Sequence, residues 1–368
     1  MPPAGNSREG AFRVRLAALV IPLLMPGAVS FLPLRARTAD PAWRATVSLR
    51  GAYDDNILRF SDLYLDLFRK GSDPGRFHIR TGDDVVLQSA AQLSVRFEAL
   101  PRLPTTVSGG IRLRTGLRNP IKNFTALSLR VRQAAGSGTW ASLAYSLIPS
   151  FYVRHYRIDE DLPQGESYQP FTYGKERVSL ELRRQVAAGT VVSLELALAR
   201  SLHNGYFTAY DTREREGSID LSRRLHSRFL AAASFRYTDA RAEGRVSGGG
   251  MDPSYREIRW GLACVWDLPP IRTLRHSLQV EAAYLRRAYG SRLPVEADPL
   301  HAGRLDHAAD ADLGYRLELG AGWAVTADYG WFLRDAGSVS PVNERLLSEE
   351  RDYVQNAVGL GCSYVLEW

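Results

Sequence analysis

The chain is poor in cysteine, lysine and long apolar runs. Its two cysteines, Cys264 and Cys362, are too few for a disulfide framework, and neither has the spacing of a metal site. Lysine occurs only at positions 70, 122 and 175, although the formal net charge is +7. No run of basic residues resembles a nucleic-acid-binding arm. The mean hydropathy of −0.22 excludes a bundle of transmembrane helices.

One apolar segment, LAALVIPLLMPGAVSFLPL, follows three arginines near the N-terminus. A basic segment followed by a segment of this kind is typical of a secretory signal, and its three prolines disfavour a membrane anchor. We therefore expect residues 1–38 to form a signal peptide and short tail, cleaved near residues 30–40. Residues 39–368 are predicted to form one exported domain.

Alternation of apolar with polar or small residues is abundant along the rest of the chain. It places one set of side chains on each face of a strand. About fourteen segments show it, most of them long enough to cross a bilayer at the tilt of barrel strands. They are residues 45–53, 87–97, 107–117, 127–131, 141–147, 178–182, 192–198, 219–221, 229–237, 258–268, 278–284, 305–319, 323–333 and 358–368. A soluble all-β protein stays open as an alternative, because alternation alone does not exclude it.

The connections between these segments alternate in length. One set is short: LPRLP, AAGSG, VAAGT, RLHSR, LPPIR and LGAG. The other set is mostly long: 55–83, 149–170, 202–213, 239–254, 287–303 and 335–350, with only 118–123 short. Short connections at one end of the strands and long connections at the other end are typical of outer-membrane barrels. The predicted fold is all-β: a transmembrane antiparallel up-and-down β-barrel of about fourteen strands, with short periplasmic turns and long extracellular loops.

Aromatic residues fall near the ends of the apolar faces. Amphipathic rings are most stable at the boundary between lipid and water, so we expect two aromatic girdles in contact with membrane lipid. The predicted periplasmic girdle contains Trp43, Trp266, Trp323 and Trp368, and the extracellular girdle contains Trp260, Trp331, Tyr53, Tyr237 and Tyr284.

The chain ends SYVLEW, with Tyr364, Leu366 and Trp368 on one face. This ending resembles the C-terminal signature of Gram-negative outer-membrane β-barrel proteins, including porin-like members. The resemblance implies a location in the cell outer membrane and recognition of these three residues by the barrel-assembly machinery. It indicates the class and not the member.

If apolar residues face lipid, charged residues of the other parity face the interior. The early strands place there a predicted basic wall: Arg50, Arg96, Arg112, Arg114, Arg130, Arg132, Arg177 and Arg183. The late strands place there a predicted acidic side: Glu281, Asp310, Asp312, Glu318 and Asp328. Opposed charge across a water-filled lumen concentrates anions near the basic wall. The alternative is that these residues pair across neighbouring strands and only solvate the lumen.

Two of the long loops are candidates for constricting the lumen. In residues 55–83, Ser61 suits a helix N-cap and Gly71 a helix stop, so we expect a short helix that either constricts the lumen or packs on the rim. The aromatic and charged loop 149–170 is the other candidate constriction. Asp54, Asp55 and Asn56 offer oxygen ligands for Ca²⁺, but without a loop of fixed spacing they favour a turn.

No catalytic motif stands out. The histidines are scattered, and no serine, histidine and acid share one depth on adjacent strands. The predicted function is a porin-like channel for passive diffusion of small polar, possibly anionic, solutes, with no enzyme activity, cofactor, metal or nucleic-acid partner. Two alternatives stay open: a loop-closed structural or surface-interaction barrel and, less favoured, a lipid-modifying enzyme.

Overall fold

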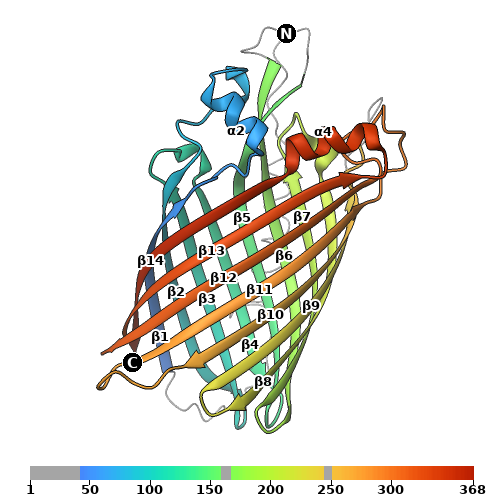
Figure 1. The fold of residues 1–368 in the computed structure, drawn as a ribbon. Helices are drawn as coiled ribbons and strands as arrows, with labels where there is room; N and C mark the ends of the chain where they lie inside the picture. Colours follow the sequence, from blue (N-terminus) through green and yellow to red (C-terminus); the bar gives the residue numbers. More distant parts are fainter. Residues whose placement is uncertain (1–41, 159–166, 244–250) are drawn as a thin grey trace.

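The computed structural model describes residues 42–158, 167–243 and 251–368, so the predicted signal segment lies outside the described residues. Within these ranges fourteen antiparallel strands each pair with their neighbours in sequence, and β1 pairs with β14 to close the barrel (Figure 1). The predicted all-β, up-and-down barrel is thereby confirmed. The strands are β1 (Ala42–Asp54), β2 (Asp84–Leu100), β3 (Leu103–Gly116), β4 (Phe124–Ala134), β5 (Thr139–Arg157), β6 (Tyr168–Ala187), β7 (Thr190–His203), β8 (Thr212–His226), β9 (Phe229–Ala242), β10 (Tyr255–Asp267), β11 (Arg275–Tyr289), β12 (Arg304–Gly320), β13 (Trp323–Ser338) and β14 (Tyr353–Glu367).

Short helices gather at the end of the barrel that carries the long connections (Figure 1). They are α2 (Asp62–Arg69) and α4 (Pro341–Arg351), with 3-10 turns η2 (Pro74–Arg76), η3 (Pro120–Lys122) and η4 (Thr208–Tyr210). Within the described ranges, none of the helices has both the length and the apolar character needed to cross a membrane. The C-terminus lies at the opposite end, with the tight turns (Figure 1). We call the loop-bearing end the extracellular mouth, as in barrels of this topology.

The barrel is apolar on its outside. Leu196 and Leu262 are each 68% exposed, and Leu360 is 66% exposed, all at mid-strand on outward positions. Apolar exposure of this extent around a closed sheet is unfavourable in water and favourable in lipid. Closure also pairs the backbone groups of both edge strands, which a lipid environment requires.

A tight turn joins β13 to β12 on the side opposite the mouth. Gly322 there has φ of +84°, and a Cβ at this position would overlap the carbonyl oxygen of Val365. Glycine is therefore required for β14 to approach this turn closely.

Two of the predicted loops are partly regular structure. β5 continues to Arg157 and β6 begins at Tyr168, so most of the predicted loop 149–170 is a hairpin. Residues 159–166 lie outside the described residues. The predicted loop 335–350 contains α4, and α4 packs on β13 and α2. Ser340 at the N-cap and Pro341 at the first helical position were the available sequence signals for this helix. In both places aromatic and charged side chains contact other loops at the extracellular mouth, so regular structure extends beyond the apolar part of the strands.

Candidate functional site: the barrel interior and its mouth

The eight arginines of the predicted basic wall all occupy inward positions in the strand register. Three of them are neutralised by carboxylates. The Arg50 Nε lies 2.8 Å from Asp328, Arg114 lies 3.4 Å from Asp54, and Arg177 lies 3.0 Å from Glu216. The sequence left pairing open as the alternative to a freely charged wall, but it did not indicate which carboxylates are the partners.

The pair between Arg50 and Asp328 reaches across an intervening strand. Arg50 is on β1 and Asp328 on β13, with β14 between them. A Cβ at Gly359 of β14 would overlap both charged groups. Glycine at an inward position was therefore the available sequence signal for this ion pair.

The remaining arginines keep more of their charge available. Arg96, Arg112 and Arg183 are exposed inside the barrel, and none of them makes an ion pair with another described residue. Arg130 lies 3.7 Å from Glu181, and the Arg132 guanidinium stacks 4.3 Å above Trp140. A hollow of about 340 Å³ adjoins this surface, lined by Arg44, Thr46, Gln92, Ser94, Thr106, Ser108, Arg130 and Arg132. Hydroxyl, amide and guanidinium donors thus share one concave face.

Carboxylates lie on the far side of the interior. Glu281, Asp310, Asp312, Glu318 and Asp328 all occupy inward positions. Asp310 lies 2.9 Å from the Arg259 guanidinium, and Asp220 lines the same hollow of about 240 Å³ as Asp310 and Glu281. Asp220 and Arg259 were missed from the sequence, although the same alternation places Asp220 inward on β8 with Glu214 and Glu216 and places Arg259 inward on β10 with Glu257. Strand β4, which carries Arg130 and Arg132, and strand β11, which carries Glu281, are half the circumference apart, so the two charged faces oppose each other.

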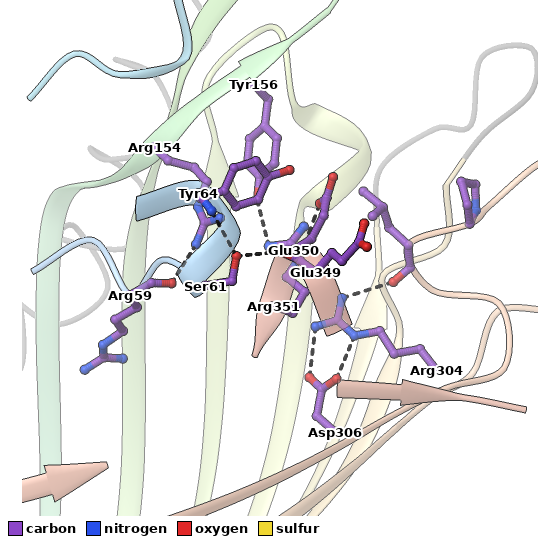
Figure 2. A network of polar contacts seen from close by, with 12 residues as sticks. Arg59, Ser61, Tyr64, Arg154, Tyr156, Arg304, Asp306, Glu349, Glu350 and Arg351 are labelled. Carbon is purple, nitrogen blue, oxygen red and sulfur yellow. Dashed lines mark hydrogen bonds and ion pairs between the residues drawn. The ribbon is translucent and has the colours of Figure 1, made fainter. Parts of the chain in front are cut away.

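The extracellular mouth is crossed by a network of loop contacts (Figure 2). The Ser61 hydroxyl, at the start of α2, donates to the carbonyl oxygen of Glu349 in α4 at 2.5 Å. Arg351, at the end of α4, donates to the Tyr156 hydroxyl of β5 at 2.9 Å. Arg154 of β5 donates back to the carbonyl oxygen of Arg59 at 3.3 Å. The first loop, α4 and the β5–β6 hairpin are therefore tied together.

Aromatic contacts continue this network around the mouth. The rings of Tyr156 and Phe171 lie 5.3 Å apart, those of Phe171 and Tyr210 5.0 Å, and those of Tyr210 and His301 5.6 Å. The Asn343 side chain of α4 then donates to the carbonyl oxygen of Pro299 at 2.6 Å and completes the circuit. We call these residues, together with Ser61 and Arg351, the mouth network.

A buried ion cluster supports the mouth network from below (Figure 2). Asp306 is 1% exposed and accepts from the Arg304 guanidinium at 2.7 and 3.0 Å and from Arg334. Arg304 also donates to the carbonyl oxygen of Leu300 at 3.0 Å. A buried carboxylate shared by the buried guanidinium of Arg304 and the half-buried guanidinium of Arg334 fixes the loop between β11 and β12 in one geometry.

The helix predicted in the first loop is present, with Ser61 as its N-cap. Of the two expected positions, the helix takes the one on the rim of the barrel. Tyr64 joins a hydrophobic cluster with Ile57, Leu58 and Phe60, and this cluster also contains Val86 and Tyr152 at the mouth.

Lys122 of η3 lies in the same region. Its ammonium donates to the carbonyl oxygens of Tyr152 and Val153, each at 3.1 Å. Burial lowers the pKa of Lys122 to about 7, and the positive charges of Arg154, Arg59 and Arg114 act in the same direction. The charge of the mouth therefore changes near neutral pH.

The aromatic residues predicted for the girdles all occupy outward positions. Trp43 and Trp368 stack with their centroids 6.5 Å apart across the β1–β14 closure, and Trp323 lies 4.8 Å from Tyr364. At the other end, Trp260 is 57% exposed. Contact of these rings with lipid, and recognition of Tyr364, Leu366 and Trp368 during assembly, stay predictions.

The acidic segment after β1 forms a turn. Asp54 accepts from the backbone N–H of Asn56 at 3.1 Å, and Asp55 accepts from the side chain of Asn356 at 2.8 Å. Asn56 exchanges two hydrogen bonds with Phe60. These oxygens are occupied by the turn and by β14, and within the described residues no group of histidine, cysteine or carboxylate side chains has the arrangement of a metal site.

The histidines are dispersed. The ring of His307, at an outward position, lies 2.5 Å from the Tyr284 hydroxyl, while His226, the last residue of β8, lies beside Ser227. For the described part of the chain, the pair of His307 and Tyr284 has no serine or carboxylate hydrogen-bonded to it. The prediction that the chain is not an enzyme stays a prediction.

A closed antiparallel barrel with an even number of strands, an apolar exterior, a charged interior, tight turns at one end and long loops at the other is an outer-membrane β-barrel. The chain therefore belongs to this structural class, and the cell outer membrane is the location for which its surface is built.

Comparison with known proteins adds fold-level likenesses. No protein-family model and no curated protein matches the chain. Among solved structures, a loop L8 deletion mutant of OmpT, an outer membrane protein of Vibrio cholerae, is 9% identical, with 89% of this chain and 100% of that chain covered and a TM-score of 0.47. An anion-selective porin from Comamonas acidovorans is 11% identical, with 89% and 100% covered and a TM-score of 0.45. The outer membrane channel DcaP of Acinetobacter baumannii is 11% identical, with 88% and 97% covered and a TM-score of 0.46. The class rests on the barrel's own geometry rather than on these likenesses.

Proposed function

We propose that the protein is a channel for passive diffusion of small polar solutes, with a preference for anions. The observation that carries this proposal is the exposed arginine surface inside the barrel, where Arg96, Arg112 and Arg183 have no carboxylate partner among the described residues. An exposed guanidinium in a narrow aqueous lumen raises the local concentration of anions and presents donors suited to carboxylates and phosphates. The opposing carboxylates orient dipolar solutes across the lumen.

The test is single-channel recording of the refolded protein in a planar bilayer under a salt gradient. We expect discrete conductance steps with a reversal potential shifted toward that of the anion. A folded, inserted barrel with steps of cation preference contradicts the anion proposal, and the absence of any conductance contradicts the channel proposal as a whole.

The mouth network favours a second candidate, a barrel closed by its loops that acts through its surface. The contacts from Ser61 through Arg351 to Asn343 join the loops into one circuit. In this case the wild-type protein is silent in the bilayer, and its loops are the functional surface.

A pair of variants separates the two candidates. Arg351→Ala removes the hydrogen bond to Tyr156 and releases the end of α4 from β5. Arg345→Ala removes an exposed ion pair with Glu349 on the same helix and serves as the matched control. If the protein is a channel narrowed by its mouth network, Arg351→Ala raises the open probability or the step size and Arg345→Ala leaves both unchanged. Equal silence of both folded variants and the wild type supports the closed barrel.

We also propose that SYVLEW engages the barrel-assembly machinery and that the outward aromatic rings contact membrane lipid. The supporting observation is that Leu366 and Trp368 lie outward and exposed at the closing strand.

A further inference from the structure

Five arginines stand on the outside of the barrel where β8 to β11 approach the mouth: Arg213, Arg215, Arg241, Arg256 and Arg286. They share outward parity with exposed apolar residues of the same strands, such as Ile219, Tyr237 and Leu262. The side chains of Arg213, Arg241 and Arg256 are 68%, 69% and 73% exposed. We call these five residues the outer basic patch.

The strand register makes the outer basic patch continuous. Arg215 lies opposite Asp239, Asp239 lies opposite Arg256, and Arg286 lies opposite Ile258 on the next strand. The arginines therefore occupy four neighbouring strands at similar heights. Spacing between adjacent strands is about 5 Å, which brings guanidiniums of neighbouring strands within reach of one phosphorylated headgroup.

Aromatic residues fix the depth of the outer basic patch in the membrane. Tyr284 lies two residues below Arg286 on β11, and Trp260 lies four residues below Arg256 on β10. At about 3.3 Å per residue, the arginines lie roughly 7–13 Å beyond these rings along the tilted strands. Tyrosine and tryptophan prefer the lipid–water boundary, so the arginines fall at the level of the lipid headgroups.

Carboxylates offset only part of this charge. Asp239 lies 3.0 Å from Arg241 and 3.7 Å from Arg256, and Glu243 pairs with Arg213. Within the described residues, Arg215 and Arg286 have no ion-pair partner. On the adjoining strand β7, the outward Arg200 lies opposite Arg213. On other strands, the charged outward residues near the mouth include the acidic Asp55, Glu176 and Asp335. Among the outward strand positions near the mouth that the structure describes, the excess of positive charge thus lies on the side formed by β7 to β11.

We propose that the outer basic patch binds the phosphorylated headgroups of lipids in the outer leaflet. Guanidiniums bind phosphate through paired, charge-assisted hydrogen bonds, and phosphate is the anionic group present at this depth. Such binding fixes one side of the barrel toward anionic lipid and does not depend on whether the lumen conducts.

The experiment measures binding of diphosphoryl lipid A, and of the same lipid after dephosphorylation, to the refolded barrel in neutral detergent by native mass spectrometry. The patch variant is Arg215→Gln with Arg286→Gln, which leaves no carboxylate without its partner. The control variant is Arg184→Gln with Arg223→Gln, which removes two outward arginines near the opposite end.

We expect the wild type and the control variant to bind the diphosphoryl form more tightly than the dephosphorylated form, and the patch variant to lose about tenfold in that preference. Equal binding of the two lipid forms by the wild type overturns the proposal, and so does equal preference in the patch and control variants. Heat-dependent electrophoretic mobility verifies that each variant is folded. If the patch variant does not fold, the single variant Arg286→Gln against Arg184→Gln gives the same comparison, with an expected loss of about threefold.

Discussion

Reversing the charge of two exposed lumenal arginines tests quantitatively how the interior charge acts on ions. Arg112 is exposed without an ion-pair partner among the described residues, and Arg130 is exposed with Glu181 3.7 Å away. Arg112→Glu with Arg130→Glu removes two positive charges and adds two negative charges, a change of four unit charges on one wall. Neither residue packs in the mouth network, so the barrel is expected to fold.

The magnitude follows from Coulomb's law. One unit charge about 8 Å from an ion in water contributes about 0.5 kcal/mol, and screening at 0.1 M salt reduces this by roughly half. Four unit charges then disfavour a monovalent anion by about 1 kcal/mol and favour a monovalent cation by the same amount. The ratio of anion to cation preference therefore falls by about 2 kcal/mol, or roughly thirtyfold at the site. At 1 M salt the Debye length is about 3 Å, and most of this effect disappears.

The assay is the reversal potential of single channels under KCl gradients centred on 0.1 M and on 1 M. Arg112→Gln with Arg130→Gln changes two unit charges and is expected to give half the shift. Arg184→Glu with Arg223→Glu makes the same change of four unit charges at outward positions, outside the lumen, and is expected to leave the reversal potential unchanged. An unchanged reversal potential in the folded Glu variant at 0.1 M refutes the role of this surface, and a shift that persists at 1 M refutes the electrostatic reasoning.

Three further perturbations act on the mouth and on the closure of the barrel. The pKa of Lys122 is about 7 in the folded state and 10.5 in the unfolded chain, so between these pH values the unfolded chain binds one more proton than the folded protein. The stability of the wild type relative to Lys122→Met should therefore rise with pH from 7 toward 10, by about 1.4 kcal/mol per pH unit. A stability difference in denaturant unfolding that does not depend on pH contradicts the burial argument. Asp306→Ala leaves the buried Arg304 and the half-buried Arg334 without their carboxylate and should cost about 3–5 kcal/mol of stability. Faster proteolysis of the loop 290–303 would detect this loss, whereas unchanged cleavage shows that the cluster does not hold this loop. Trp368→Ala and Trp43→Ala remove the same stacking contact, worth about 0.5–1.5 kcal/mol, so both should refold similarly in detergent. Only Trp368→Ala should reduce the amount of barrel in cell outer membranes, and equal reduction assigns Trp368 a purely structural role.

Sequence alone was sufficient for the architecture because a barrel obeys a local rule. Each strand alternates lipid-facing and interior-facing residues, so the face on which each residue lies can be assigned from the sequence of that strand alone. The fourteen strands, the separation of tight turns from long loops, and the inward or outward position of each charged residue follow from that rule. The helix capped by Ser61 was also predictable, since its signals lie within ten residues of chain.

Contacts between distant segments required the tertiary structure. The partner of Arg50 is Asp328, 278 residues away and two strands along, because the register and an intervening glycine decide which inward side chains meet. The charge that remains exposed in the lumen is therefore smaller than the count of inward arginines. Likewise the positions of α4 and of the β5–β6 hairpin are decided by contacts across the mouth, such as that of Arg351 with Tyr156, although Ser340 and Pro341 signal the start of α4 locally. Alternation along a strand is a property of neighbouring residues, whereas pairing and closure depend on which strands and loops the fold brings together.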